Sequence, residues 1–269
     1  MSKKYSYKLT NKKLKDKIKI ATDDLIKANA RLKQLDQAKS EFVSIASHQL
    51  RTPLTIIKGY VSMLLDGNFG NLTNKKKSAM RKIFESNERL IRIVENLLNI
   101  SRIESGKMLF NFQKKYIQDI IISVINEFGN IIIEKNIKLI CKKPIKPLPK
   151  ITMDVEKIRQ VILNLVDNAI KYSNGGKIVI NLTIKNKKII FCIKDQGIGI
   201  KKEDMPGLFE KLRRGTGAAL ICAEGTGLGL YVAKQIIIGH KGKIWAESIG
   251  EGKGSKVLFE LPINCNDIK

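Results

Sequence analysis

The sequence predicts an α+β protein in which a long helical region comes first and a domain of mixed helices and strands follows. Up to about Ser105, apolar residues recur every three or four positions, which indicates helices. After Ser105-Gly106 the pattern changes to short β-like runs between shorter helical segments. We therefore expect three regions: a coiled-coil helix at 1–38, a helical dimerisation region at 39–105 and an α/β sandwich domain at 106–269.

The first region carries a narrow apolar seam in steps of four and three residues. Its positions are Leu14, Ile18, Ala21, Leu25, Ala28, Leu32, Leu35 and, after Lys39, Phe42. This spacing predicts a coiled coil. A lone amphipathic helix is the alternative reading, but so narrow a seam buries little area within one chain. A parallel dimer is therefore favoured.

The second region should be a helical hairpin. The first helix continues past His48 with one apolar face, made of Phe42, Ala46, Leu50, Leu54, Ile57, Val61 and Leu64. His48 lies almost opposite this face, and Pro53 should kink the helix just beyond it. The segment 66–71 is rich in turn formers, and Thr73 suits the N-cap of a second amphipathic helix. Two such hairpins, one from each chain, would make a four-helix bundle.

The third region should contain six strands and three helices. We expect strands near Leu109–Phe112, Lys138–Cys141, Lys177–Ile184, Lys188–Lys194, Lys243–Glu247 and Lys256–Leu261. We expect helices near Ile117–Glu134, Val155–Tyr172 and Leu228–Ile238. Trp245 and Phe259 are expected in the core, and His240, in a helix-to-strand turn, is given a structural role.

Composition narrows the function classes. The chain has 269 residues, 43% of them apolar, and no run of about 18 apolar residues that could cross a membrane. Its cysteines show no C-x-x-C spacing, so we expect reduced thiols and a soluble, cytoplasmic protein. The net charge of +25 would suggest a nucleic acid or an anionic membrane as partner. We expect no direct nucleic-acid binding, because lysines are spread along the whole chain without interleaved aromatics.

The first candidate site is the segment SHQLRTPLT. A lone histidine on a helix is usually an ordinary surface residue. Here His48 is expected to face solvent on a dimerising helix, and a neutral imidazole is a nucleophile at cytosolic pH.

The second candidate site is the helix segment QVILNLVDNAIKYS. Asn164, Asn168 and Lys171 share one helical face because they lie at i, i+4 and i+7. Amide oxygens suit a hydrated Mg²⁺ that bridges phosphates, and an ammonium suits phosphate charge. A solvated polar face is the alternative, which the glycine motifs that follow make less favoured.

Three further motifs follow in order. In KDQGIGI, Asp195 comes directly after a strand, and Gly197 and Gly199 let the backbone pass close to a ligand. In DMPGLFEKLRRG, Arg213 or Arg214 could reach a phosphate. In GTGLGLYVAKQI, a glycine-rich turn opens a helix whose N-terminal amides favour phosphate. This turn contributes Gly225, Thr226, Gly227, Leu228 and Gly229.

Together these five motifs, from about Lys39 to Pro262, resemble the dimerisation domain and the Bergerat-type ATP-binding domain of sensor histidine kinases. The resemblance implies that His48 accepts a phosphoryl group from ATP, with Mg²⁺, and passes it to an aspartate of a response-regulator receiver domain. It also implies a homodimer and leaves room for an upstream sensor protein.

The resemblance assigns further roles to single residues. It places Asp195 on the adenine amino group, Tyr172 over the nucleotide and Phe209 at the start of a lid, and it makes Thr52 the residue that positions a water for dephosphorylating the partner. Related ATPases that hydrolyse ATP have a glutamate where this sequence has Asn164, so transfer is favoured over hydrolysis.

Two positions depart from the family pattern. Gln49 stands where most members have Glu or Asp as a base next to the histidine, and Gln cannot take up a proton. Leu212 stands where a second lid aromatic is common. The alternative function is therefore an ATP-binding dimeric scaffold that acts mainly as a response-regulator phosphatase with weak kinase activity.

Overall fold

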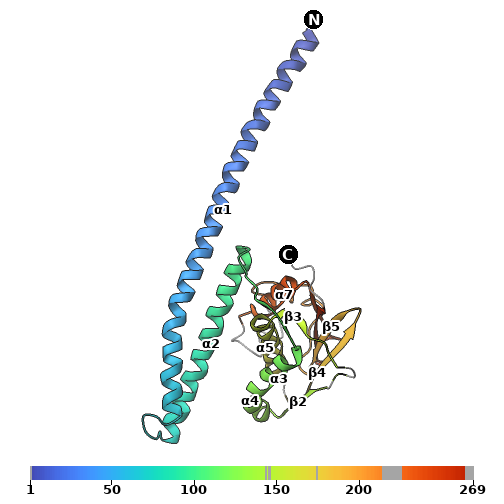
Figure 1. Cartoon of the computed structure of the whole chain (residues 1–269). Helices are drawn as coiled ribbons and strands as arrows, with labels where there is room; N and C mark the ends of the chain where they lie inside the picture. Colours follow the sequence, from blue (N-terminus) through green and yellow to red (C-terminus); the bar gives the residue numbers. More distant parts are fainter. Residues whose placement is uncertain (1, 143, 145–146, 174, 214–225, 264–269) are drawn as a thin grey trace. The chain divides into compact units, whose positions relative to one another are not determined.

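The computed structural model describes residues 2–142, 144, 147–173, 175–213 and 226–263. The chain divides into two compact units, Met1–Met108 and Leu109–Lys269 (Figure 1). We call them unit 1 and unit 2 and describe each by itself. No helix in the described part of the chain has both the length and the apolar character needed to cross a membrane.

Unit 1 is a helical hairpin. Its helices are α1 (Ser2–Leu65) and α2 (Asn74–Glu104), and α1 continues through Pro53. Thr73 is the N-cap of α2, as predicted, and its side chain accepts a hydrogen bond from the backbone amide of Lys76. The buried side chains between the helices include Val61, Val94 and Leu98.

Two buried polar side chains of α2 also bind the backbone of α1. The Asn87 amide donates to the Leu54 carbonyl at 2.8 Å, and the Ser101 hydroxyl donates to the Ser40 carbonyl at 2.7 Å. These bonds have defined partners along α1, so they fix the register of α2 against it.

Unit 2 combines a mixed sheet with helices. Its helices are α3 (Ile117–Glu127), α4 (Gly129–Glu134), α5 (Val155–Lys171) and α7 (Gly229–Gly239). Its strands are β1 (Phe112–Lys115), β2 (Ile137–Cys141), β3 (Ile151–Asp154), β4 (Gly176–Lys185), β5 (Lys188–Lys194), β6 (Lys243–Glu247) and β7 (Lys256–Pro262). The five-stranded sheet has the order β2-β4-β5-β7-β6, in which only β2 and β4 are parallel, and β1 pairs with β3 separately.

One face of the large sheet forms the core of unit 2. Figure 1 shows α3 and α5 on one side of β4 and β5. Along β4, β5 and β7, fully buried residues alternate with more exposed ones, which is the period of two expected when one face is covered. Phe191 and Phe259 are fully buried in the core and stack with their ring centroids 4.7 Å apart. The predicted α+β fold class, with helices first and a mixed α/β domain after them, is confirmed.

The sequence placed most elements of unit 2 correctly but not all. The bounds of β5 and β6 are as predicted, whereas the strand expected at Leu109–Phe112 begins at Phe112, and Leu109 is 86% exposed. β3 was not predicted, because four residues directly before a helix give too short a period-two signal. The single helix expected at Ile117–Glu134 is broken at Phe128, before Gly129, a residue that destabilises helices.

The two remaining structural predictions had opposite outcomes. His240 is 2% exposed, its Nε2 accepts a hydrogen bond from the Asp154 backbone amide at 3.0 Å, and its Nδ1 donates to the Ile236 carbonyl at 2.8 Å. The predicted structural role of His240 is confirmed. The prediction that Trp245 lies in the core is wrong, because it is half-buried on the face of β6 that the described elements leave uncovered, with its indole donating to Glu247.

Candidate functional site

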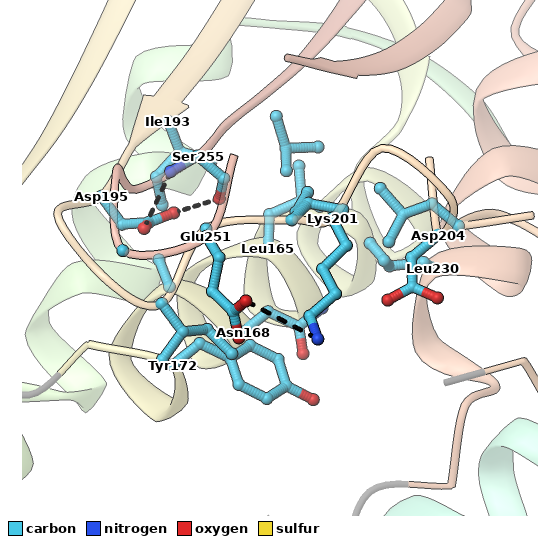
Figure 2. Close-up of a pocket in the computed structure, with 17 residues that line it drawn as sticks. Leu165, Asn168, Tyr172, Ile193, Asp195, Lys201, Asp204, Leu230, Glu251 and Ser255 are labelled. Carbon is cyan, nitrogen blue, oxygen red and sulfur yellow. Dashed lines mark hydrogen bonds and ion pairs between the residues drawn. The ribbon is translucent and has the colours of Figure 1, made fainter. Parts of the chain in front are cut away.

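Unit 2 contains a pocket of about 350 Å³ between α5 and the loops that follow β5 and β6. Its lining combines apolar side chains of α5 and the sheet with a few polar groups (Figure 2). The lining residues are Leu165, Asn168, Ala169, Tyr172, Ile193, Asp195, Ile198, Gly199, Ile200, Lys201, Asp204, Leu208, Leu230, Glu251, Gly252, Ser255 and Val257. A largely apolar pocket with few polar groups suits a flat organic ligand.

Asp195 is the buried acidic group of this pocket, and it is only 7% exposed. Its Oδ1 accepts a hydrogen bond from the backbone amide of Gly197 at 2.9 Å. Ser255 donates twice, from its backbone amide to Oδ1 at 3.1 Å and from its hydroxyl to Oδ2 at 2.5 Å (Figure 2). These donors fix the carboxylate in one orientation. It lies beside the apolar wall of the pocket, where it can accept a hydrogen bond from an amino group of a planar ligand.

Two loops hold the pocket in shape by backbone contacts. The Gly254 amide donates to the Gly197 carbonyl at 3.1 Å, and the Ile198 amide donates to the Tyr172 carbonyl at 3.1 Å. Gly199 lies so close to the second loop that an added Cβ would be 2.1 Å from the Gly250 carbonyl oxygen. Glycine is therefore required there for the two loops to meet.

The predicted polar residues of α5 have different surroundings. Asn168 and Tyr172 line the pocket, and Tyr172 is the C-cap of the helix. The Asn164 side chain donates its amide to the Gly229 carbonyl at 3.1 Å, so it joins α5 to the start of α7. Lys171 forms an ion pair with Asp167 one turn earlier on the same helix.

The predicted glycine-rich turn and lid are only partly described. Gly225 and Arg214 lie outside the described residues. Gly229 begins α7, Leu228 is its buried N-cap residue, and the Leu228 amide donates to the Thr226 hydroxyl. Gly227 lies directly against the backbone of Leu212.

Two residues of the predicted lid are described, Phe209 and Arg213, and their predicted roles toward a nucleotide stay predictions. Phe209 does not line the pocket, whereas its neighbour Leu208 does. The Arg213 guanidinium packs over Gly207 and pairs with Glu210 at 2.9 Å.

The sequence prediction missed four polar residues of the pocket, namely Lys201, Asp204, Glu251 and Ser255. Ser255 holds Asp195, and Lys201 and Glu251 form an ion pair of 3.6 Å between the two loops (Figure 2). Ser255 and Glu251 belong to the segment GEGKGS, which has a glycine at every second position before a strand. That density of glycines was a signal of close backbone approach that the prediction did not use.

The second candidate site, in unit 1, is the exposed surface around His48. His48, Gln49 and Thr52 are exposed on α1, next to the buried Ser47, as predicted for His48. One turn further, the Thr55 hydroxyl donates to the Arg51 carbonyl at 2.9 Å. Because Pro53 has no amide proton, the helix cannot make its usual hydrogen bond to the Gln49 carbonyl. His48 is therefore accessible beside a locally weakened stretch of helix.

Comparison with known families matches both units. Residues 38–106 match the His Kinase A (phospho-acceptor) domain. Residues 153–264 match the family described as histidine kinase-, DNA gyrase B-, and HSP90-like ATPase. The two matches contain His48 and the Asp195 pocket, respectively.

A curated relative extends the match along most of the chain. The chain is 36% identical over 233 residues to the sensor histidine kinase WalK of Bacillus subtilis, which covers 85% of the chain and 37% of the relative. The chain spans roughly a third of the length of the first curated relatives that it matches.

Solved structures of similar fold carry related names. ShkA, solved in complex with AMPPNP, gives a TM-score of 0.65 at 23% identity, over 82% of this chain and 45% of that one. The histidine kinase ThkA, solved in complex with the response regulator protein TrrA, gives a TM-score of 0.55 at 26% identity. That match covers 83% of this chain and 61% of the ThkA chain.

Proposed function

The chain belongs to the sensor histidine kinases, and on that premise we propose that it transfers the γ-phosphoryl group of ATP to His48 and then to an aspartate of a response-regulator receiver domain. The observation that carries the proposal is the oriented Asp195 carboxylate in an apolar pocket, in a chain that also exposes His48 on a helical hairpin. The titles of the ShkA and ThkA structures name, for those proteins, a nucleotide analogue and a response regulator.

ATP binding follows from the chemistry of the pocket. The adenine ring would lie between Leu165 and Val257, with its amino group donating to Asp195. Tyr172 at the rim would cover the base. The triphosphate would extend toward Gly227 and Gly229 at the start of α7, where free backbone amides favour phosphate.

The side chains of α5 fit a magnesium ion that is held mainly by phosphates and water. The Asn164 amide nitrogen is engaged by Gly229, which leaves its oxygen as the group available to a cation, and Asn168 lies in the pocket. Among the described residues no group of three or more His, Cys, Asp or Glu side chains could hold a metal by itself. Bound there, Mg²⁺ would neutralise negative charge on the phosphates.

His48 is the group that would accept the phosphoryl group. A ring nitrogen attacks the γ-phosphorus, a P–N bond forms, the bond to the bridging oxygen breaks, and ADP leaves. The imidazole must lose a proton in the course of this transfer. Gln49 can orient the ring by hydrogen bonding but cannot take up that proton, so solvent must accept it.

Transfer to the regulator then moves the phosphoryl group to a carboxylate oxygen and frees His48. Thr52, exposed one turn beyond His48, would position a water when the regulator is dephosphorylated.

We also propose that the active form is a homodimer. Unit 1 exposes large apolar residues that one hairpin cannot cover, among them Leu32 at 60%, Phe42 at 73% and Leu50 at 51%. A second copy would bury them in a four-helix bundle, and an upstream sensor protein could act through α1.

The proposal is tested with ATP labelled in its γ-phosphate. We expect the purified protein to gain an acid-labile, alkali-stable label that disappears in His48→Ala. His240→Gln is the matched control, because it removes the other histidine of the chain and leaves His48 in place. Label that survives in His48→Ala, or a protein that retains no magnesium nucleotide, would overturn the assignment.

A further inference from the structure

The large sheet of unit 2 has a second face that the described elements leave uncovered. Residues on this face alternate with the buried residues of β4, β5 and β7 and are half-buried or exposed. Strand register places four of them in one row across the sheet. The row is Asn181, Cys192, Leu258 and Trp245. We call this side the outer face.

The outer face carries an unusual arrangement of positive charge. Three pairs of lysines lie directly opposite each other on neighbouring strands, and like charges in this position destabilise a sheet. The pairs are Lys138 with Lys177, Lys185 with Lys188, and Lys194 with Lys256.

The acidic groups of the outer face offset only part of this charge. Its carboxylates are Glu247 and Glu260, and each already pairs with a lysine, Lys256 and Lys188 respectively. With Lys243 the face has seven lysines against two glutamates, whereas the whole chain has 50 basic and 25 acidic residues. The excess is therefore greater than the general lysine bias explains.

We propose that the outer face docks an amphipathic helix of a partner protein, with an apolar stripe flanked by Asp and Glu side chains. The stripe would cover Cys192, Leu258 and Trp245, as α5 covers the opposite face of the same sheet. The flanking carboxylates would reach the lysine pairs on both sides of the row and relieve their mutual repulsion.

Charge and shape favour this occupant over three others. A second copy of the chain that docked through its own outer face would bring lysines against lysines. An anionic membrane is bound best by apolar side chains that protrude, whereas Trp245 and Leu258 are half-buried. A nucleic-acid backbone would engage the lysines and leave the apolar row unfilled.

This proposal does not depend on the proposed kinase activity. Ile193 and Val257 line the nucleotide pocket from the covered side of the sheet, opposite the row of Cys192 and Leu258. A ligand on the outer face therefore leaves the pocket free.

The chain contains its own reporter for this test, because Trp245 is its single tryptophan. The chain of 269 residues is titrated with a synthetic peptide of about 14 residues, roughly four helical turns, with a leucine stripe flanked by glutamates. We expect the emission of Trp245 to move to shorter wavelength and to saturate. A peptide of the same composition in scrambled order, which has no stripe, should produce no saturable shift.

Charge reversal tests the lysine pairs. Lys138→Glu with Lys194→Glu should weaken peptide binding by about tenfold or more and should not impair folding, because each change replaces a repulsive pair by an attractive one. The matched control is Lys114→Glu with Lys115→Glu on β1, which packs with α5 on the other side of unit 2. Equal weakening in the control, no shift with the striped peptide, or a shift produced only by anionic vesicles or only by duplex DNA would overturn the proposal.

Discussion

At the residue scale, the hydroxyl of Ser255 decides how firmly Asp195 is oriented. Ser255→Ala removes a hydrogen bond of 2.5 Å to the carboxylate, while the backbone amides of Gly197 and Ser255 still hold the other oxygen. A bond to a charged group contributes about 1.5–3 kcal/mol, so we expect ATP affinity to fall by about tenfold or more, as measured by calorimetry. Ser255→Thr keeps the hydroxyl and should retain most of the affinity. Unchanged affinity in the alanine variant would show that the hydroxyl is not needed to orient Asp195.

Gln49 sets a second prediction at this scale, because it stands beside His48 and cannot accept a proton. Gln49→Glu supplies a carboxylate at the same position on exposed α1. General-base help is typically worth about 10²–10⁴-fold, so we expect the initial rate of autophosphorylation to rise by at least about tenfold. The rate is measured with labelled ATP at saturating concentration. A rate that stays the same or falls would show that the base is not what limits transfer.

His240 gives unit 2 a defined dependence of stability on pH. Burial lowers the pKa of His240, while the Ile236 carbonyl and the Asp154 carboxylate act in the opposite direction. The unfolded chain, with an ordinary histidine pKa of about 6.5, therefore binds a proton first as the pH falls. We expect the free energy of unfolding to be retained above about pH 6.5 and lost progressively below it. The free energy of unfolding at each pH is measured by urea denaturation, with the emission of Trp245 as the signal.

The two histidines of the chain supply the control for this dependence. His240→Gln should flatten the loss of stability between about pH 7.5 and 5.5, because no imidazole is then forced to stay neutral in the core. His48→Gln changes an exposed residue of unit 1 and should leave the slope of unit 2 unchanged. A slope that persists in His240→Gln would assign the dependence to other groups.

At the scale of elements, the loop between β6 and β7 shapes the pocket through two glycines that share a positive φ but differ in the space available for a side chain. Gly252 and Gly254 have φ of +71° and +68°, so alanine is strained at both, at a cost of about 1–2 kcal/mol. An added Cβ at Gly252 meets nothing within 4 Å, whereas at Gly254 it would lie 2.3 Å from the Asp195 carbonyl oxygen. We expect Gly254→Ala to lower the unfolding free energy of unit 2 by at least about 3 kcal/mol, clearly more than Gly252→Ala. Equal losses would mean that the loop moves away from Asp195 without cost.

The same loop shows what the sequence could and could not predict. Asn168 and Asp195, which line the pocket, could be named from the sequence because helical spacing and the end of a long alternating strand are local patterns. Ser255 was missed because its role depends on β7 lying beside β5, a long-range pairing that no local pattern reports. The half-buried position of Trp245 has the same cause, since its side of β6 is decided by which face of the sheet the helices cover.

At the scale of the whole molecule, the two units differ in how completely they cover their apolar residues. Unit 2 has fully buried residues on both α5 and the sheet, as an independently folded domain does. Unit 1 leaves Leu25, Leu32 and Leu35 at least 60% exposed along α1. An apolar seam of this length on a monomer favours association with a second copy.

A pair of matched substitutions tests whether that seam joins two chains. Ala28 lies on the seam between Leu25 and Leu32, and Ala30 lies two residues further on the same exposed helix but off the seam. Ala28→Lys would place a charge at the centre of the dimer contact, so we expect the dissociation constant from analytical ultracentrifugation to rise by about tenfold or more. Ala30→Lys adds the same charge and length to the outer side of the helix and should change the dissociation constant little. If both variants weaken the dimer equally, net charge is responsible, and if neither does, the contact lies in the hairpin around Phe42 and Leu50.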